Sequence, residues 1–242
     1  MSNESDDLSL SLQKTTVSSI IIPENAELKS ATLNIYAFGF NSKKVNIFRI
    51  TDDWKEMDVT WNSFDGSYDP VPDPSDTVPY FIPDAKGWQK VEITNIVNSW
   101  LKGKYDNYGI LLDQELATPD NHDYSIYYSK EAIEDSKIPY IEIEYKVNNF
   151  IENIKIDISD DAYIWEPIED LNTGDKPKLY TGYVNNDWAN GEKQSLLRFD
   201  ISKEKEVKCE TAFAFGGPNA TCFSKYGFNR LGRTNGPLRP LE

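Results

Sequence analysis

Apolar and polar positions alternate along much of the chain. In residues 30–38, SATLNIYAF, every second residue from Ala31 to Ala37 is apolar. The same alternation recurs over residues 139–145 and 154–158, where charged residues separate the isoleucines. Half-buried strands of this kind predict an all-β, antiparallel, jelly-roll-like sandwich. Turn-forming stretches separate the strands: Asp65-Gly66, the proline-rich residues 69–79 and Lys86-Gly87.

One short helix interrupts this pattern, at residues 94–103, TNIVNSWLKG. Thr94 or Asn95 can cap its start, and Gly103 can end it. Its apolar residues then share one face: Ile96, Val97, Trp100 and Leu101. We expect this helix to close one end of the sandwich.

The chain divides into three predicted regions. The polar pair Asn148-Asn149 follows a finished strand, so a first domain is expected over residues 1–146. Residues 147–202 are again rich in strand-like segments. Residues 203–242 begin with a charged run and continue rich in Gly and Asn, which predicts a tail dominated by loops.

Four blocks of the first region follow one another in a recognisable order. They cover residues 22–38, 50–62, 87–112 and 127–145. Together they resemble the DNRLRE repeat, a β-sandwich module of bacterial and archaeal surface and secreted proteins. That family is related to the carbohydrate-binding modules of alginate-binding proteins and to disaggregatase-type repeats. The resemblance spans residues 20–146, although the six letters of the family name do not occur here.

The order of the family's elements is changed in this chain. Domains that resemble it open with a DAYI-like strand, an Asn-x-Gly turn and a strand similar to SLLRFDLS. Here the matching segments come last: Asp161–Ile164, Asn172–Gly174 and Ser195–Ser202. Either residues 161–202 begin a second, partial repeat of a tandem array, or they complete a sandwich that lacks its opening strands. Such strands can pair within the chain or in a neighbouring subunit.

Charge and cysteine content narrow the classes of partner. The chain has 40 Asp and Glu against 25 Lys and Arg, a formal net charge of −15. This charge disfavours nucleic acid and anionic membranes.

No apolar run approaches the roughly 20 residues of a membrane span, and the first residues have no secretory signal pattern. Cys209 and Cys222 can form one local disulfide or remain two thiols.

The sequence does not predict a catalytic site. Acidic residues crowd the segment from Asp52 to Asp58, but no spacing singles out an acid–base pair. The one histidine, His122, lies in a turn-rich loop, and no G-x-S-x-G motif occurs. The resemblance implies instead that Trp54 and Trp61 are structural packing residues. Trp100 on the predicted helix is expected to have the same role.

Two kinds of ligand remain as candidates, a metal ion and a glycan. Asp-rich loops at residues 69–76 and 158–163 supply the oxygen ligands that calcium prefers, so a structural calcium is a possible cofactor. Glycan contact would use exposed aromatic rings, which stack on the apolar faces of sugars. The candidates are Trp88, Tyr68, Tyr80 and Tyr105, with Lys86, Lys90, Lys102 and Lys104 able to offset the acidic charge towards an anionic glycan.

These features predict a non-catalytic module, extracellular or at the cell surface, that contacts a glycan or another surface polymer. The glycan part depends mainly on the family resemblance. A structural role is the alternative, in which incomplete sandwiches assemble into a fibre or array by exchanging strands.

Overall fold

The chain folds into two compact units, Met1–Lys203 and Glu204–Glu242. The computed structural model describes residues 20–23, 25–70, 77–115, 123–185, 190–203, 222–224 and 227–229. In the second unit, β15 (Cys222–Ser224) and β16 (Gly227–Asn229) pair antiparallel. Cys209 and the side chain of Cys222 lie outside the described part, so their disulfide stays a prediction. The same holds for His122.

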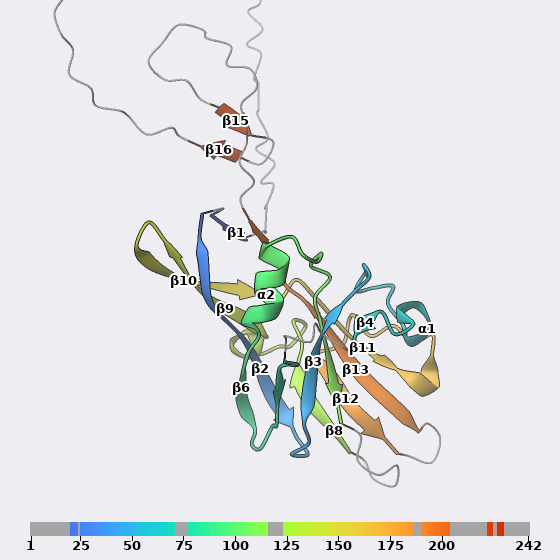
Figure 1. The fold of residues 1–242 in the computed structure, drawn as a ribbon. Coiled ribbons are helices and arrows are strands. Elements are labelled where there is room, and N and C mark those ends of the chain that lie inside the picture. Colours follow the sequence, from blue (N-terminus) through green and yellow to red (C-terminus); the bar gives the residue numbers. More distant parts are fainter. Residues whose placement is uncertain are drawn as a thin grey trace, which may run out of the picture. The chain divides into compact units, whose positions relative to one another are not determined.

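The first unit is built from antiparallel strands and confirms the predicted all-β class (Figure 1). One hydrogen-bonded path runs β10-β9-β2-β8-β12-β13-β7-β3-β4, with β11 on β13, β5 on β3 and β6 on β2. The strands are β2 (Glu27–Gly39), β3 (Val45–Ile50), β4 (Tyr68–Asp69), β5 (Tyr80–Phe81), β6 (Gly87–Glu92), β7 (Ile110–Gln114), β8 (Asp123–Tyr128), β9 (Tyr140–Val147), β10 (Phe150–Asp157), β11 (Asp160–Trp165), β12 (Lys178–Val184) and β13 (Gly191–Arg198). A separate parallel pair joins β1 (Ile20–Ile22) to β14 (Ile201–Lys203).

The path folds back on itself around the main hydrophobic core. Leu33 of β2 and Ile141 of β9 share one buried cluster with Ile47 of β3 and Leu112 of β7. Because these strands stand far apart in the path, their shared core requires two facing layers, as in a sandwich. A second buried cluster lies on the other side of β7 and β13 and includes Trp54.

Helix α2 (Thr94–Leu101) is the predicted short helix and packs against the main core. Its N-cap is Ile93, one residue earlier than expected, and Ile93 makes no side-chain capping bond. Thr94 Oγ1 instead accepts a hydrogen bond of 2.9 Å from the Ala31 amide of β2. Gly103 has a φ of +64° just past the helix end, as predicted for a C-terminal glycine. The described part contains three further single turns: α1 (Trp61–Phe64), η1 (Asp135–Lys137) and η2 (Glu166–Ile168).

Strands between residues 160 and 198, which include the segments that resemble the family's opening strands, pair with earlier strands of the same chain. β13 hydrogen-bonds to β7, with Leu196 opposite Leu111, and β12 pairs with β8. Gly109, with a φ of +95°, makes the close approach possible, since a Cβ there would collide with the Leu197 carbonyl. Strands on both sides of the predicted boundary after residue 146 therefore belong to one sheet and one compact unit.

Contacts of Trp54 and Asp53 attach the acidic segment of residues 52–58 to β13. Trp54 is buried, its Nε1 donates to the Tyr108 carbonyl over 2.8 Å, and the Arg198 guanidinium lies 4.8 Å from its ring centre. Arg198 also bonds to Asp53 Oδ1 at 2.8 Å. Trp61, at the start of α1, is only partly buried against the second cluster. Among the described residues, no helix is long and apolar enough to cross a membrane.

We predict that truncation after Val147 abolishes cooperative folding. The shortened chain keeps β7 and β8 but loses their partners β13 and β12, so buried residues such as Leu111 become exposed. Each large apolar side chain that is no longer buried costs about 1.5–3 kcal/mol, and a few such losses exceed the usual stability of a domain. Urea denaturation followed by near-ultraviolet circular dichroism measures this. Truncation after Lys203 is the control and should unfold cooperatively, and a cooperative transition for the shorter chain would contradict the prediction.

Candidate functional site

Aromatic side chains gather on the outer face of the β6-β2-β9 and β8 region. Ala31 to Ala37 face the core at alternate positions of β2, so Tyr36 and Phe38 point the other way. In the strand register, Tyr36 lies opposite Trp88 of β6. Asn34, two residues earlier on the same face, lies opposite Tyr140 of β9. We call this surface the aromatic–lysine face; it comprises Tyr36, Phe38, Trp88, Tyr128, Tyr140, Lys86, Lys137, Lys155 and Lys178.

The five rings form a continuous chain of edge contacts. Trp88 lies 5.5 Å from Tyr36 and 5.2 Å from Tyr140, measured between ring centres. Tyr128 lies 5.6 Å from Tyr36 and 5.7 Å from Phe38. All four contacts are near perpendicular, the arrangement that the quadrupoles of aromatic rings favour. The rings therefore hold one another in place, while Trp88 and Phe38 remain more than a third exposed.

Lysine ammonium groups surround these rings. Lys178 Nζ lies 3.8 Å and Lys86 Nζ 5.2 Å from the centre of the Phe38 ring. Lys137 Nζ lies 4.8 Å from the Tyr36 ring and Lys155 Nζ 4.5 Å from the Tyr140 ring. Cation–π attraction at such distances contributes about 0.5–1 kcal/mol at an exposed site.

Two of the four lysines already have acidic partners. Lys137 pairs with Glu134 at 2.6 Å, and Lys155 pairs with Asp157 at 2.7 Å. The hydrogen bond that Lys137 donates to Glu134 raises the pKa of Lys137, so this ammonium stays charged. In the part of the chain that the structure describes, no carboxylate pairs with Lys86 or Lys178 at salt-bridge distance. The face thus offers positive charge on a chain whose net charge is −15.

The four aromatic residues that the sequence predicted for glycan contact lie in different parts of the structure. Trp88 is in the aromatic–lysine face, whereas Tyr80 of β5 is 54% exposed elsewhere, with Lys44 Nζ 4.8 Å from its ring. Tyr105 is stacked by the Arg49 guanidinium at 3.6 Å. Tyr68 lines a different hollow beside α1. The four residues do not form one site.

Four of the five rings of the face were missed: Tyr36, Phe38, Tyr128 and Tyr140. The signal was present in the alternation of residues 30–38, because an apolar inward face leaves Tyr36 and Phe38 outside. Neighbouring aromatic residues on the outward face of a strand can build a contiguous apolar patch, and such patches mark interaction sites. Which outward rings of other strands lie beside them depends on strand order, which the sequence does not reveal.

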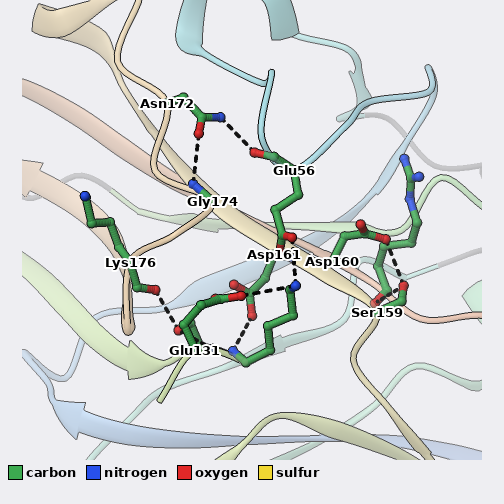
Figure 2. A network of polar contacts seen from close by, with 11 residues as sticks. Glu56, Glu131, Ser159, Asp160, Asp161, Asn172, Gly174 and Lys176 are labelled. Atoms are coloured by element: carbon green, nitrogen blue, oxygen red, sulfur yellow. Dashed lines mark hydrogen bonds and ion pairs between the residues drawn. The ribbon is translucent and has the colours of Figure 1, made fainter. Parts of the chain in front are cut away.

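A second candidate is a group of three carboxylates, shown in Figure 2. Glu56, Glu131 and Asp161 bring oxygen atoms within 4.8 Å of one another. Lys130 lies among them: its Nζ contacts Glu56 Oε2 at 2.7 Å and Glu131 Oε1 at 3.1 Å. We call these four residues the acid–lysine cluster.

Backbone bonds tie this cluster to three distant segments. The Lys130 amide donates to Asp161 Oδ2 and the Asp161 amide donates to Glu56 Oε1, both over 2.8 Å. Asn172 Nδ2 donates to the Glu56 carbonyl over 2.7 Å. Gly174 then packs so closely that a Cβ there would collide with Glu56. The cluster therefore joins the loop of residue 56, the end of β8 and the segment of β11.

Burial sets the charge of the cluster. Asp161 is almost fully buried, which raises the pKa of its carboxyl group, and the neighbouring Glu131 and Glu56 raise it further. Burial alone would lower the pKa of Lys130, but its bonds to Glu56 and Glu131 outweigh this and raise it. An ammonium thus lies where a metal ion would otherwise neutralise the carboxylates.

The cluster fits a structural joint better than a calcium site. Calcium takes six to eight oxygen ligands, and here the Lys130 ammonium lies against two of the three carboxylates. Asp161 belongs to the acidic loop predicted for calcium, whereas residues 71–76 of the other loop lie outside the described part. Structural calcium in that second loop stays a prediction.

We predict that Lys130→Met destabilises the protein by about 2 kcal/mol. The change leaves Glu56 and Glu131 facing each other without their ammonium, at a site that is partly rather than fully buried. Lys55→Met is the matched control, since Lys55 forms an exposed pair with Asp58, and it should change stability by less than about 0.5 kcal/mol. Urea denaturation measures both, and equal effects of the two changes would refute the joint.

Comparison with known proteins identifies a carbohydrate-binding family. The model of one family, carbohydrate-binding module family 96, matches residues 14–145. Neither the curated proteins nor the solved structures contain a significant match. The family match supports the carbohydrate-binding side of the resemblance, while the DNRLRE assignment stays a proposal. Because the match covers more than half of the 242 residues, the chain belongs to carbohydrate-binding module family 96.

Proposed function

We propose that this chain is a non-catalytic module that binds an acidic polysaccharide through the aromatic–lysine face. The observation that supports this most strongly is the combination of five mutually packed rings with four lysines on one sheet face. The rings supply apolar area for the CH faces of successive sugar rings. The ammonium groups supply partners for carboxylate or sulfate groups along the same polymer.

The geometry of the face favours an extended ligand over a single small molecule. The rings come from four neighbouring strands, β9, β6, β2 and β8, so they extend across several strands of the sheet. Their edge contacts hold them in place before binding, which lowers the entropic cost of forming a complex. Acidic polymers of this kind occur outside cells and on cell surfaces, and that is the location we propose.

We predict that Trp88→Ala weakens binding to a polyuronate such as alginate by about thirtyfold, or 2 kcal/mol, the effect of losing a central ring. Isothermal titration calorimetry of the full chain measures this. Tyr80→Ala is the matched control, because Tyr80 is exposed but lies outside the face, and it should bind as the wild type does.

Lys86→Ala combined with Lys178→Ala should weaken the same binding and reduce its salt dependence, since two screened charges are removed. Uncharged dextran should bind more weakly than alginate. Wild-type affinity of Trp88→Ala for alginate, or a loss with Tyr80→Ala alone, would show that the glycan binds elsewhere.

Self-association through a strand edge is the second candidate function. β13 and β12 pair within the chain, so filling the sandwich does not require a neighbour. The observation that favours association is β10: among the described strands it pairs with β9 alone, at the end of the sheet. Phe150 and Ile151 on this edge are 70% and 59% exposed. An exposed edge with apolar residues can accept a strand of another molecule.

We predict that any concentration-dependent oligomer is lost in Ile151→Lys, because an edge lysine opposes strand addition. Size-exclusion chromatography with light scattering measures the mass. Ile133→Lys is the matched control, since Ile133 is 97% exposed and lies outside β10. A wild-type chain that stays monomeric at all concentrations, or oligomers that persist in Ile151→Lys, would reject this candidate.

A further inference from the structure

A hollow of about 300 Å³ lies beside α1, away from the rings of the aromatic–lysine face. α1 and the following turn form one wall, through Trp61 and Asn62, and Tyr68 of β4 adds to it. Glu192 and Gln194 of β13 and Glu169 also line the hollow. We call this hollow the α1 groove. Its volume is at the lower end of the range of about 300–1,000 Å³ for ligand sites.

The α1 groove and the aromatic–lysine face lie on the outer surfaces of the two layers of the sandwich. Trp61 and Tyr68 of the groove pack against the second cluster, which includes Leu196 of β13, whereas the next residue, Leu197, belongs to the main core. Gln194 is two residues from Leu196 and therefore points to the side of the second cluster. Tyr36 and Phe38 of the face point away from the main core on β2.

The polar groups of the groove are fixed by hydrogen bonds. Gln194 is only 6% exposed, and its Nε2 donates to Glu192 Oε1 over 3.0 Å and to Asp113 Oδ1 over 3.4 Å. The Gln194 side chain also hydrogen-bonds to the Tyr68 hydroxyl. On the wall formed by α1, Asn62 Nδ2 donates a hydrogen bond of 3.0 Å to Asp170 Oδ1. Groups held in this way are preorganised to hydrogen-bond a ligand.

The charge of the groove differs from that of the face. Burial raises the pKa of Glu192 to about 8, and its hydrogen bond with Asp113 also raises it. None of the described lining residues is Lys or Arg. A uronate carboxylate would therefore meet acidic groups without a cationic partner. A hydroxyl-bearing, uncharged ligand meets no such repulsion.

We propose that the α1 groove is a second saccharide site, which takes a single uncharged sugar residue. The rings of Trp61 and Tyr68 supply an apolar wall for the sugar ring, and Gln194 and Glu192 supply hydrogen-bond partners for its hydroxyls. With both sites the module contacts an acidic polymer on one side of the sandwich and a neutral sugar on the other. Two sites on opposite sides allow it to bridge two glycans.

The test is an NMR titration of the ¹⁵N-labelled full chain, with the Trp61 and Trp88 indole N–H signals as reporters of the two sites. The probes are the methyl glycosides of glucose, galactose and mannose, with glucuronic acid as the anionic comparison. We expect at least one neutral glycoside to shift the Trp61 signal in a saturable way and to leave Trp88 unmoved. Glucuronic acid should leave Trp61 unmoved.

Asn62→Trp fills the groove from an exposed helix position and should weaken the neutral-sugar binding at least tenfold. Lys102→Trp is the matched control, an added surface tryptophan outside the groove, and should bind as the wild type does.

Tyr68→Phe, which removes one hydroxyl, should weaken binding severalfold and covers the case in which Asn62→Trp fails to fold. Trp88→Ala should bind the neutral sugar normally, so this proposal can fail or hold independently of the acidic-glycan site. No saturable shift of Trp61 with any neutral glycoside, or wild-type affinity in a folded Asn62→Trp, would overturn it.

Discussion

The pairing of β13 with β7 is the interaction on which the rest of the structure depends. It places Leu196 opposite Leu111 and fills the gap between β12 and β3 in the sheet path. Through it, the last third of the first unit buries the outer cluster around Trp54 and completes the main core. Gly109 permits the approach, and the acid–lysine cluster ties the neighbouring β11 segment to the loop of Glu56. Strands near the end of the first unit thus pair with strands from its earlier part, and the sandwich is completed by segments far apart in the sequence.

The two layers of the sandwich present chemically different outer surfaces. On one side, Lys86 and Lys178 add positive charge beside five aromatic rings, while Lys137 and Lys155 are paired with carboxylates. On the other side, the α1 groove has carboxyl and amide groups around Trp61. Net charge alone disfavoured an anionic glycan, but the local field at a surface depends on the groups nearest to it, since salt screens charges beyond about 8–10 Å. The distribution of lysines, and not their number, makes the acidic-glycan proposal consistent with a net charge of −15.

The sequence predicted which segments form strands and the helix better than it predicted which strands lie side by side. Alternation located β2, β9 and β10, and the apolar spacing with Gly103 located α2, because these signals are local. The N-cap at Ile93 was missed, since Thr94 bonds to Ala31 of another strand and not to its own helix. The ring chain of Tyr36, Trp88 and Tyr140 brings together residues more than 50 positions apart. Long-range strand order decides such contacts, and no local pattern encodes it. The same limit explains why the sequence pattern grouped Trp88 with Tyr68, Tyr80 and Tyr105, which the structure places apart.

β13 completes the sandwich of its own chain. An isotope-filtered NOE experiment on an equimolar mixture of ¹³C,¹⁵N-labelled and unlabelled protein checks this at the contact between Leu196 and Leu111. A strong NOE is expected between the two residues within the labelled chain, and none between labelled and unlabelled chains. An intermolecular NOE at this pair would mean that the strand is donated to a neighbour and would refute the intramolecular pairing.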